Sequence, residues 1–291
     1  MIVRVPASSA NLGPGFDSFG LAWKIYNEIE FRFAEDGLSI SGCDERYCGE
    51  DNLAYVAYVR TMERCGRKTP GLQIRFLKTE IPVSRGLGSS AALITAGVTA
   101  ANAMNALGLS KEELLDVATS VEGHPDNIAP ALYGGLTASL MEGSHAVTRS
   151  FPLSDKLCFT LLIPPFELST ALSRSVMPRE VGMRDAVFNL SRTALLPRAL
   201  ADGDAELLRL ALDDRLHQPY RFPLIEGAET AKQLATDCGA IRLCISGSGS
   251  TLLCVANDAG FAGKMKRAMS EACPTWLVLE AQPDDRGAAL L

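Results

Sequence analysis

The stretch PVSRGLGSSAA, residues Pro82–Ala92, runs directly into the helix-compatible segment LITAGVTAANAMNAL. A loop of glycine and serine therefore opens straight into the start of a predicted helix. Gly86 and Gly88 can adopt backbone conformations closed to other residues, so a ligand can approach the main chain closely. The free N–H groups of the first helical turn, together with the helix dipole, would face that ligand. The stretch predicts a phosphate-binding loop.

Three other interpretations of this loop have to be weighed. A Walker A loop requires Gly-Lys-Ser/Thr after four spacer residues, and no lysine follows the loop. A dinucleotide fingerprint fits Gly86–Ala91 by letter, but the acidic residue expected about 20 positions further on is missing from residues 102–109. A serine-capped helix after a glycine turn, without any ligand, stays open when the segment is taken alone.

Patterning along the chain predicts a mixed α+β protein. Strand-like apolar runs and helical periodicity both occur, without internal repeats or low-complexity tracts. Residues 142–154 are polar and turn-rich between two apolar strands, which indicates a boundary near residue 150. We therefore expect an N-terminal domain at 1–150 and a C-terminal domain at 151–291.

Composition argues against several classes of protein. The 28 Lys and Arg against 34 Asp and Glu give a net charge of −6 without a basic run, so we expect neither a nucleic-acid nor a membrane partner. No apolar stretch approaches 18 residues, and the chain begins with the strand-like Ile2–Val5 instead of a signal peptide, which predicts a cytoplasmic protein. The eight cysteines contain no C-x-x-C pair and are expected to be reduced.

Five further segments carry a family resemblance: ANLGPGFDSFG (10–20), EGHPDNIAPAL (122–132), FELSTALSRSVMP (166–178), DRLHQPYRFPL (214–224) and SGSGST (246–251). With RGLGSSAA they resemble, in order, the motifs of the GHMP kinases, small-molecule kinases that include galactokinase and mevalonate kinase. Within that family they are most similar to the homoserine kinases, and they cover nearly the whole chain. The resemblance implies an N-terminal domain of the ribosomal-protein-S5 domain 2 type, a ferredoxin-like C-terminal domain, and an active site in the cleft between them.

The resemblance also implies ATP and Mg²⁺ as cofactors. The Ser90 hydroxyl and the Glu122 carboxylate stand at the family's metal-binding positions and are expected to converge on Mg²⁺. From its spacing alone, Glu122 would be a solvated charge at a helix end. The adjoining GHPDN (123–127), which matches the family motif, favours a role as a metal ligand instead. Asn52 matches a position near the adenosine, although its letters also fit an ordinary helix N-cap. The residues expected around the ATP phosphates are Pro82, Val83, Ser84, Arg85, Gly86, Leu87, Gly88, Ser89, Ser90, Ala91 and Ala92.

Homoserine is a zwitterion, so its site must offer a carboxylate to the ammonium and a cation to the carboxylate. Asp17 and Asn11 match the positions that the family uses for the amino-acid head. Arg174 and Arg221 match the carboxylate-binding arginines. The resemblance therefore implies phosphorylation of the L-homoserine hydroxyl by ATP, giving O-phospho-L-homoserine and ADP in threonine biosynthesis.

The remaining candidates surround the reacting groups. Ser90, Glu122, Asn127 and Thr170 are the predicted catalytic residues, and His124 and Asn127 are also expected to contact the substrate. Asp126 is either a general base or a cap for the helix that follows it. The alternative to a base is that the substrate hydroxyl passes its proton directly to the γ-phosphate. Thr170 could likewise cap the helix that begins near Ala171.

Two other functions stay open at this point. The first is a GHMP kinase for another alcohol, and the second is a catalytically silent sensor that binds ATP and a metabolite. One departure from the family pattern is visible, because Ala171-Leu172-Ser173 stands where many relatives have Glu-Lys-Ala. Members of the family commonly form dimers, but the sequence does not fix the oligomeric state.

Overall fold

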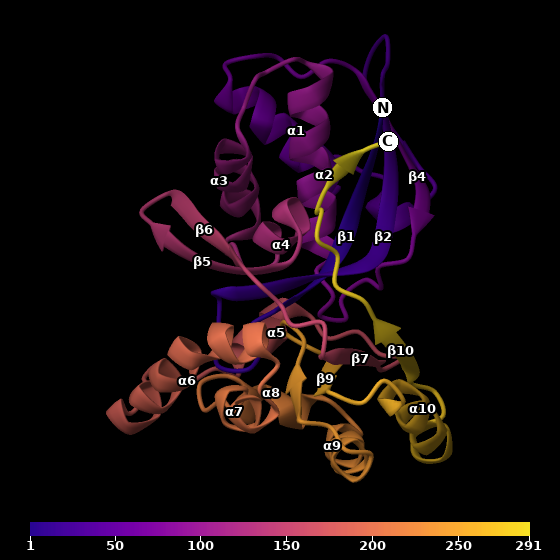
Figure 1. Cartoon of the computed structure of the whole chain (residues 1–291). Helices are drawn as coiled ribbons and strands as arrows, with labels where there is room; N and C mark the ends of the chain where they lie inside the picture. The colour runs from indigo at the N-terminus through magenta and orange to yellow at the C-terminus, as the bar shows by residue number, and fades with distance from the viewer.

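A seven-stranded sheet organises the first half of the chain in the computed structural model, which describes all 291 residues (Figure 1). The strand order is β11-β1-β2-β4-β3, with β5 paired to β2 and β6 to β5. All pairs are antiparallel except β3 with β4. The strands are β1 (Ile2–Ala10), β2 (Phe19–Phe33), β3 (Leu38–Ser41), β4 (Leu72–Thr79), β5 (Leu136–Glu142), β6 (His145–Phe151) and β11 (Ala289–Leu290).

Four helices cover one side of this sheet (Figure 1). They are α1 (Leu53–Arg64), α2 (Ser89–Met104), α3 (Lys111–Glu122) and α4 (Ile128–Tyr133). Small residues let α1 and α2 touch closely: a Cβ on Gly97 would lie 2.2 Å from the Ala54 carbonyl oxygen. A capping box of Ser110 and Glu113 fixes the start of α3. Gly88 is the N-cap of α2 and Gly123 the C-cap of α3, so Ser90 and Glu122 lie at these two helix ends.

The second half contains a four-stranded antiparallel sheet of β7 (Cys158–Ile163), β8 (Arg242–Ile245), β9 (Leu252–Ala256) and β10 (Leu277–Ala281), in the order β10-β7-β9-β8. Its helices are α5 (Thr170–Ser175), α6 (Met183–Asp202), α7 (Ala205–Ala211), α8 (Gln218–Arg221), α9 (Ala228–Asp237) and α10 (Phe261–Ala272). Along the chain, β7 is followed by helices, β8, β9, α10 and β10, and this order of elements with this strand order is the ferredoxin-like arrangement that the family resemblance implies.

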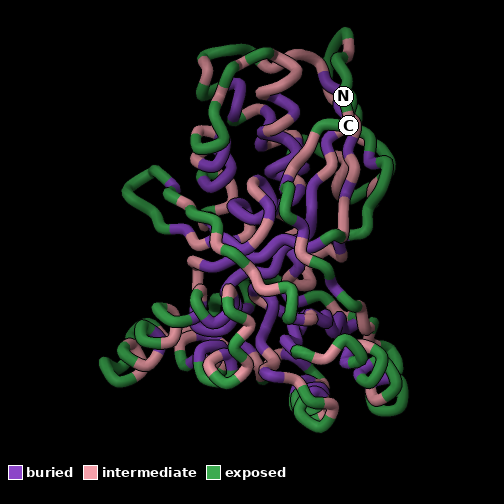
Figure 2. The backbone as a smooth tube through the Cα atoms, viewed as in Figure 1, coloured by how far each residue is buried: buried purple, intermediate pink, exposed green.

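The largest of the three hydrophobic core clusters spans both halves. The rings of Trp23 in β2 and Phe159 in β7 pack at an angle of 57° with centroids 5.3 Å apart, and both belong to the same buried cluster. Buried residues accordingly continue from one half into the other (Figure 2). The chain changes sheets between Phe151 and Cys158, close to the predicted boundary. Its last strand, β11, returns to pair with β1, and the two termini lie close together (Figure 1).

Strand β1 is longer than the strand-like Ile2–Val5 that the sequence indicates, and its extra residues lead into the site. It continues to Ala10, and the sequence pattern misses this part because residues 6–10 are buried but small. The motif ANLGPGFDSFG then forms the turn between β1 and β2. None of the helices is both long and apolar enough to cross a membrane. All eight cysteines are free thiols, as predicted.

Candidate active site

A pocket of about 600 Å³ lies between the two halves and gathers nearly all of the predicted site residues. It is lined by the β1–β2 turn, the nucleotide loop, the start of α2 and the end of α3 on one side. The loop after β7, α5, Arg221 and the turn between β8 and β9 line the other side. The predicted residues that line it are Asn11, Asp17, Asn52, Val83, Ser84, Arg85, Gly86, Gly88, Ser89, Ser90, Glu122, His124, Asn127, Thr170, Arg174 and Arg221.

Four residues of the predicted nucleotide loop do not line the pocket. Leu87, Ala91 and Ala92 are fully buried, because their apolar side chains pack into the cores around α2. Pro82 is partly buried and also lies outside the pocket lining. Any contact of these four residues with the ATP phosphates would therefore come from their main chain. They shape the loop from the core side.

Neighbouring protein atoms leave no room for a side chain at either glycine of the loop. Both have left-handed backbones, with φ of 71° at Gly86 and 68° at Gly88. A Cβ on Gly86 would lie 2.2 Å from the Ser246 carbonyl oxygen, and one on Gly88 would lie 2.1 Å from the Ser8 hydroxyl. The sequence predicts a close approach by a ligand, but here the protein itself already fills the space at both Cβ positions.

The SGSGST turn of the second half holds the nucleotide loop in place. The Ser246 hydroxyl donates to the Gly86 carbonyl at 2.5 Å, and the Thr251 N–H donates to the Arg85 carbonyl at 3.2 Å. The Arg85 guanidinium donates to the carbonyls of Pro164 and Pro165 at 3.1 and 2.6 Å. The loop is therefore clamped between the two halves before any ligand arrives.

The N-terminus of α2 faces the pocket without a side-chain cap. Gly88 is the N-cap, and no side chain accepts from the first-turn N–H groups. A serine-capped helix is therefore not what forms here. A 16-residue helix with open N–H groups at its start is a suitable anion site.

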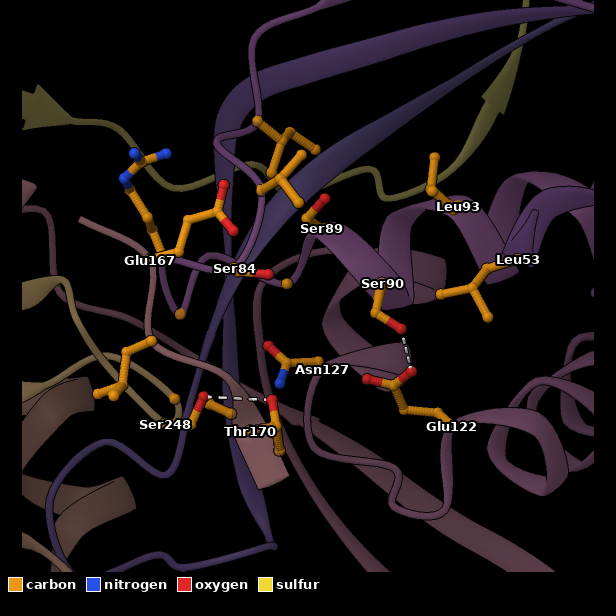
Figure 3. A pocket seen from close by; sticks show the side chains of 18 of the residues that line it. Leu53, Ser84, Ser89, Ser90, Leu93, Glu122, Asn127, Glu167, Thr170 and Ser248 are labelled. Atoms are coloured by element: carbon orange, nitrogen blue, oxygen red, sulfur yellow. Dashed lines mark hydrogen bonds between the residues drawn. The ribbon is translucent and has the colours of Figure 1, made fainter. Parts of the chain in front are cut away.

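Ser90 and Glu122 meet at this helix start (Figure 3). The Ser90 hydroxyl donates to Glu122 Oε2 at 2.5 Å, so the end of α3 reaches the start of α2. Burial raises the pKa of the Glu122 carboxyl, and the hydrogen bond from Ser90 opposes this only in part. Glu122 forms a hydrogen bond here but no ion pair. A hydroxyl and a partly buried carboxylate without a counter-cation fit a hard divalent ion whose other ligands come from phosphate and water.

Asp17 and Arg174, predicted to bind opposite ends of the substrate, bind each other. The two guanidinium nitrogens lie 2.9 and 3.2 Å from the two carboxylate oxygens. Asn11 supports this pair, since its Oδ1 accepts from the Asp17 N–H at 2.9 Å while its Nδ2 donates to the Gly247 carbonyl at 2.7 Å. Asn11 thus holds the turn that carries Asp17, and both residues have left-handed backbones.

Arg221, the last residue of α8, is a buried cation without an ion pair. It is 2% exposed, lines the pocket, and donates at 3.3 and 3.4 Å to the carbonyls of Ser173 and Gly247. Burial, with Arg174 nearby, lowers the pKa of its guanidinium. A buried charge that is not paired is costly. An anionic group of a ligand would therefore be stabilised at this end of the pocket.

His124 and Asp126 form a second charged pair at the pocket wall. His124 Nδ1 lies 2.6 Å from Asp126 Oδ1. Burial disfavours the charged imidazole, but the hydrogen bond and the negative charge of Asp126 outweigh it and raise the pKa of His124. Asp126 does not cap α4, whose N-cap is Asn127, without a side-chain cap bond. The Asp126 carboxylate instead forms a hydrogen bond with His124.

Asn127 and Thr170 face each other across the middle of the pocket (Figure 3). Asn127 Oδ1 accepts from the Ser8 hydroxyl at 2.9 Å, which leaves its Nδ2 unbonded. The Thr170 hydroxyl lies 3.4 Å from that of Ser248. Ser169, and not Thr170, caps α5 by accepting from the Leu172 N–H. Both candidates therefore have polar groups available to a ligand.

The sequence does not identify the far end of the pocket. A 3₁₀ turn at Glu45–Tyr47 contributes Tyr47 to its lining, and Asn52 holds that turn by donating to the Tyr47 carbonyl at 2.8 Å. Asn52 also caps α1 through the Ala54 N–H, so its cap role is real. The unpredicted lining residues include Cys43, Asp44, Arg46, Tyr47, Leu53, Phe76, Ile81, Leu93, Glu167 and Ser248. The 43–48 segment gives no periodic signal that could have found it.

Comparison with known families decides the classification. Residues 52–135 match the profile of the GHMP kinases N terminal domain, and residues 197–275 match that of the GHMP kinases C terminal. The chain belongs to the GHMP kinase family. This membership confirms the predicted family and its two-domain fold.

Individual relatives of this GHMP kinase agree over the full length. A homoserine kinase of Clostridium beijerinckii is 40% identical over 99% of this chain and 98% of its own length, and one from Clostridium botulinum strain Okra is 41% identical over 99% and 97%. The crystal structure of homoserine kinase from Cytophaga hutchinsonii superposes with a TM-score of 0.90 at 28% identity, covering 100% of this chain and 97% of that one. A mevalonate kinase of L. major, at a TM-score of 0.73 and 16% identity over 98% and 96%, shares the fold alone.

Proposed function

We propose that this GHMP kinase transfers the γ-phosphoryl group of ATP to the hydroxyl of L-homoserine, giving O-phospho-L-homoserine and ADP. The observation that carries the proposal is the charge arrangement at one end of the pocket. Buried Arg221 lacks an ion pair, and the Asp17–Arg174 pair lies beside it. Two cations and one carboxylate match the head of an α-amino acid.

Substrate binding would break the Asp17–Arg174 ion pair and replace it with ion pairs to the substrate. Its ammonium would take Asp17, and its carboxylate would lie between Arg174 and Arg221. The Asp17–Arg174 pair has side chains 36% and 40% exposed, so opening it costs little. Neither a sugar nor mevalonate offers an ammonium to Asp17, which favours homoserine over those alcohols.

ATP would lie along the rest of the pocket. Its phosphates would be at the open N-terminus of α2, and its nucleoside would point toward Asn52 and the Tyr47 turn. Ser90 and Glu122 would hold Mg²⁺, which when bound neutralises charge on the transferring phosphoryl group. The partly buried carboxylate of Glu122, which has no ion-pair partner, supports this assignment.

The chain's own groups then position the reaction. Asn127 Nδ2 makes no hydrogen bond, and the Thr170 hydroxyl makes only a long contact with Ser248, so both could donate to a transferring phosphoryl group that passes between the amino-acid end and Ser90. Asp126 is 2% exposed and bound to His124, so we assign it to orienting His124 instead of accepting the substrate proton. The hydroxyl proton would then pass to the phosphate. Phosphoryl transfer depends mainly on such positioning and charge neutralisation.

The test is ATP consumption with Mg²⁺ over a panel of L-homoserine, L-serine, mevalonate and galactose, with identification of the product. Homoserine should be phosphorylated far above the others. If both ATP and homoserine bound without ADP release, the chain would be a silent sensor and the enzyme assignment would be wrong. Turnover of another alcohol in preference would reassign the substrate.

A further inference from the structure

His217 is a fully buried histidine with both ring nitrogens in use. Its Nε2 lies 2.8 Å from the Gly13 carbonyl oxygen, which can only accept, so Nε2 carries the proton. The Nδ1 atom is then left with a lone pair. Arg221 Nη1 lies 3.4 Å from that atom and donates to it. The imidazole thus links the β1–β2 turn to the buried arginine.

Local structure fixes where this imidazole can be. His217 is the N-cap residue of the short helix α8, and Arg221 follows four positions later on the same face. Asp214 accepts from the backbone N–H groups of His217 and Gln218 at 3.0 and 2.7 Å. The helix start is therefore anchored independently of the imidazole ring.

Phe16 completes the arrangement. Its ring stacks on His217 with centroids 5.3 Å apart and an interplanar angle of 23°. The Arg221 guanidinium carbon lies 5.0 Å from the Phe16 centroid, and that of Arg174 lies 5.8 Å away. Burial, ahead of every nearby charge, lowers the pKa of His217, which keeps the imidazole an acceptor. Protonation would replace the acceptor with a second cation beside Arg221.

We propose that His217 is a positioning residue for substrate recognition: its Nδ1 lone pair, with the Phe16 ring, aims the Arg221 guanidinium at the substrate carboxylate. The remaining protein contacts of Arg221 are two long hydrogen bonds to carbonyls, at 3.3 and 3.4 Å. The Nδ1 lone pair therefore acts on the carboxylate end of the substrate, whereas the Nε2 proton holds the β1–β2 turn. This inference rests on the proposed function, which identifies that carboxylate.

Two substitutions separate the two hydrogen bonds of the ring. His217→Asn places an amide oxygen near the Nδ1 position and keeps an acceptor for Arg221. His217→Gln reaches the Nε2 position, so it keeps the donor to Gly13 but loses that acceptor. His145→Gln is the matched control, because His145 is 71% exposed and pairs with Asp116 on the β6 side of the molecule.

Two substrate fragments separate the ends of homoserine. 4-Hydroxybutyrate has the carboxylate without the ammonium, and 3-aminopropan-1-ol has the ammonium without the carboxylate. Their inhibition constants against homoserine, together with KM for homoserine, KM for ATP and kcat, are measured for each full-length variant. The melting temperature of each variant reports its folding.

His217→Gln should raise KM for homoserine and the inhibition constant of 4-hydroxybutyrate roughly tenfold, the size of one hydrogen bond to a charged group. The inhibition constant of 3-aminopropan-1-ol, KM for ATP and kcat should change less than about twofold, and His217→Asn should recover most of the loss. Equal losses for both fragments, or losses in both variants that follow the melting temperature, would overturn the proposal, as would a normal His217→Gln enzyme. Absence of homoserine turnover by the unmodified chain would refute the proposed function instead.

Discussion

At the scale of single residues, the pocket is defined by charges that its own protein does not fully satisfy. Glu122 is a partly buried carboxylate without a cation, and Arg221 is a buried guanidinium without an anion. Sequence motifs place both residues correctly in the pocket. The motifs could not show that Arg174 is already paired with Asp17, because that contact joins residues 157 positions apart.

Replacing Arg221 with an apolar residue should therefore lower the affinity for homoserine without lowering the stability of the protein. Arg221→Met removes a buried charge that lacks a counter-charge, so the ligand-free protein should melt at the same temperature or higher. Its affinity for homoserine should fall by roughly 2–5 kcal/mol, the range for truncating one partner of a desolvated charge pair, while ATP affinity changes little. Calorimetric titration of both ligands and a thermal melt measure this. A variant that melts lower and still binds homoserine would contradict the charge argument.

The pair at the start of α2 should control the chemical step. Ser90→Ala and Glu122→Ala should each lower kcat by on the order of 10²-fold, because the metal would no longer be held against the transferring phosphoryl group. Steady-state kinetics across a Mg²⁺ titration is the measurement. Normal turnover of both variants at every Mg²⁺ concentration would mean that the metal is held elsewhere.

At the scale of elements, the nucleotide loop is a joint between the two halves. The sequence predicts the loop and α2 because glycine, serine and helical periodicity are local signals. It could not reveal that Ser246 and Ser8 fill the space beside Gly86 and Gly88. Strand β6 was missed for a related reason: its exposed, polar residues look like a linker, and only pairing with β5 makes them a strand.

Adding a methyl group to this joint should affect nucleotide binding. Gly86→Ala would place a Cβ 2.2 Å from the Ser246 carbonyl, so the loop must shift, and KM for ATP should rise about tenfold or more with a loss of stability. Gly108→Ala is the matched control, because Gly108 has a similar φ of 73° but nothing within 4 Å of its Cβ position. Thermal melts and ATP kinetics compare the two. Equal effects would show that backbone conformation alone, and not the contact with Ser246, explains the glycine.

At the scale of the whole molecule, the C-terminal residues tie the second half back to the first. Buried Asp284 accepts from the Tyr26 hydroxyl and from the Gly287 N–H, both at 2.7 Å, just before β11 pairs with β1. Burial and this carboxylate raise the pKa of Tyr26 to about 12. The predicted boundary at residue 150 gives no hint of this return, because a two-residue strand leaves no pattern in the sequence.

Breaking this tie should lower stability without touching the chemistry. Asp284→Ala leaves the Tyr26 hydroxyl and the Gly287 N–H without a partner, and should lower the free energy of unfolding by about 2 kcal/mol. Asp285→Ala, at an 89% exposed neighbour, should have little effect. Denaturant unfolding measures both, and kcat of the folded Asp284→Ala enzyme should be unchanged. Equal stability of the two variants would argue that the tail is not a structural tie.

Under the proposed function, the pocket binds a zwitterion, and the hydroxyl of that zwitterion is phosphorylated. The most direct measurement is kcat/KM for L-homoserine, 4-hydroxybutyrate and 3-aminopropan-1-ol with ATP and Mg²⁺, with the phosphorylated product identified by ³¹P NMR. We expect O-phospho-L-homoserine as the product and a loss of roughly 10²-fold or more for each fragment, since each leaves one buried or paired charge unmet. Phosphorylation of either fragment as efficiently as homoserine, or no ester from homoserine, would contradict the account.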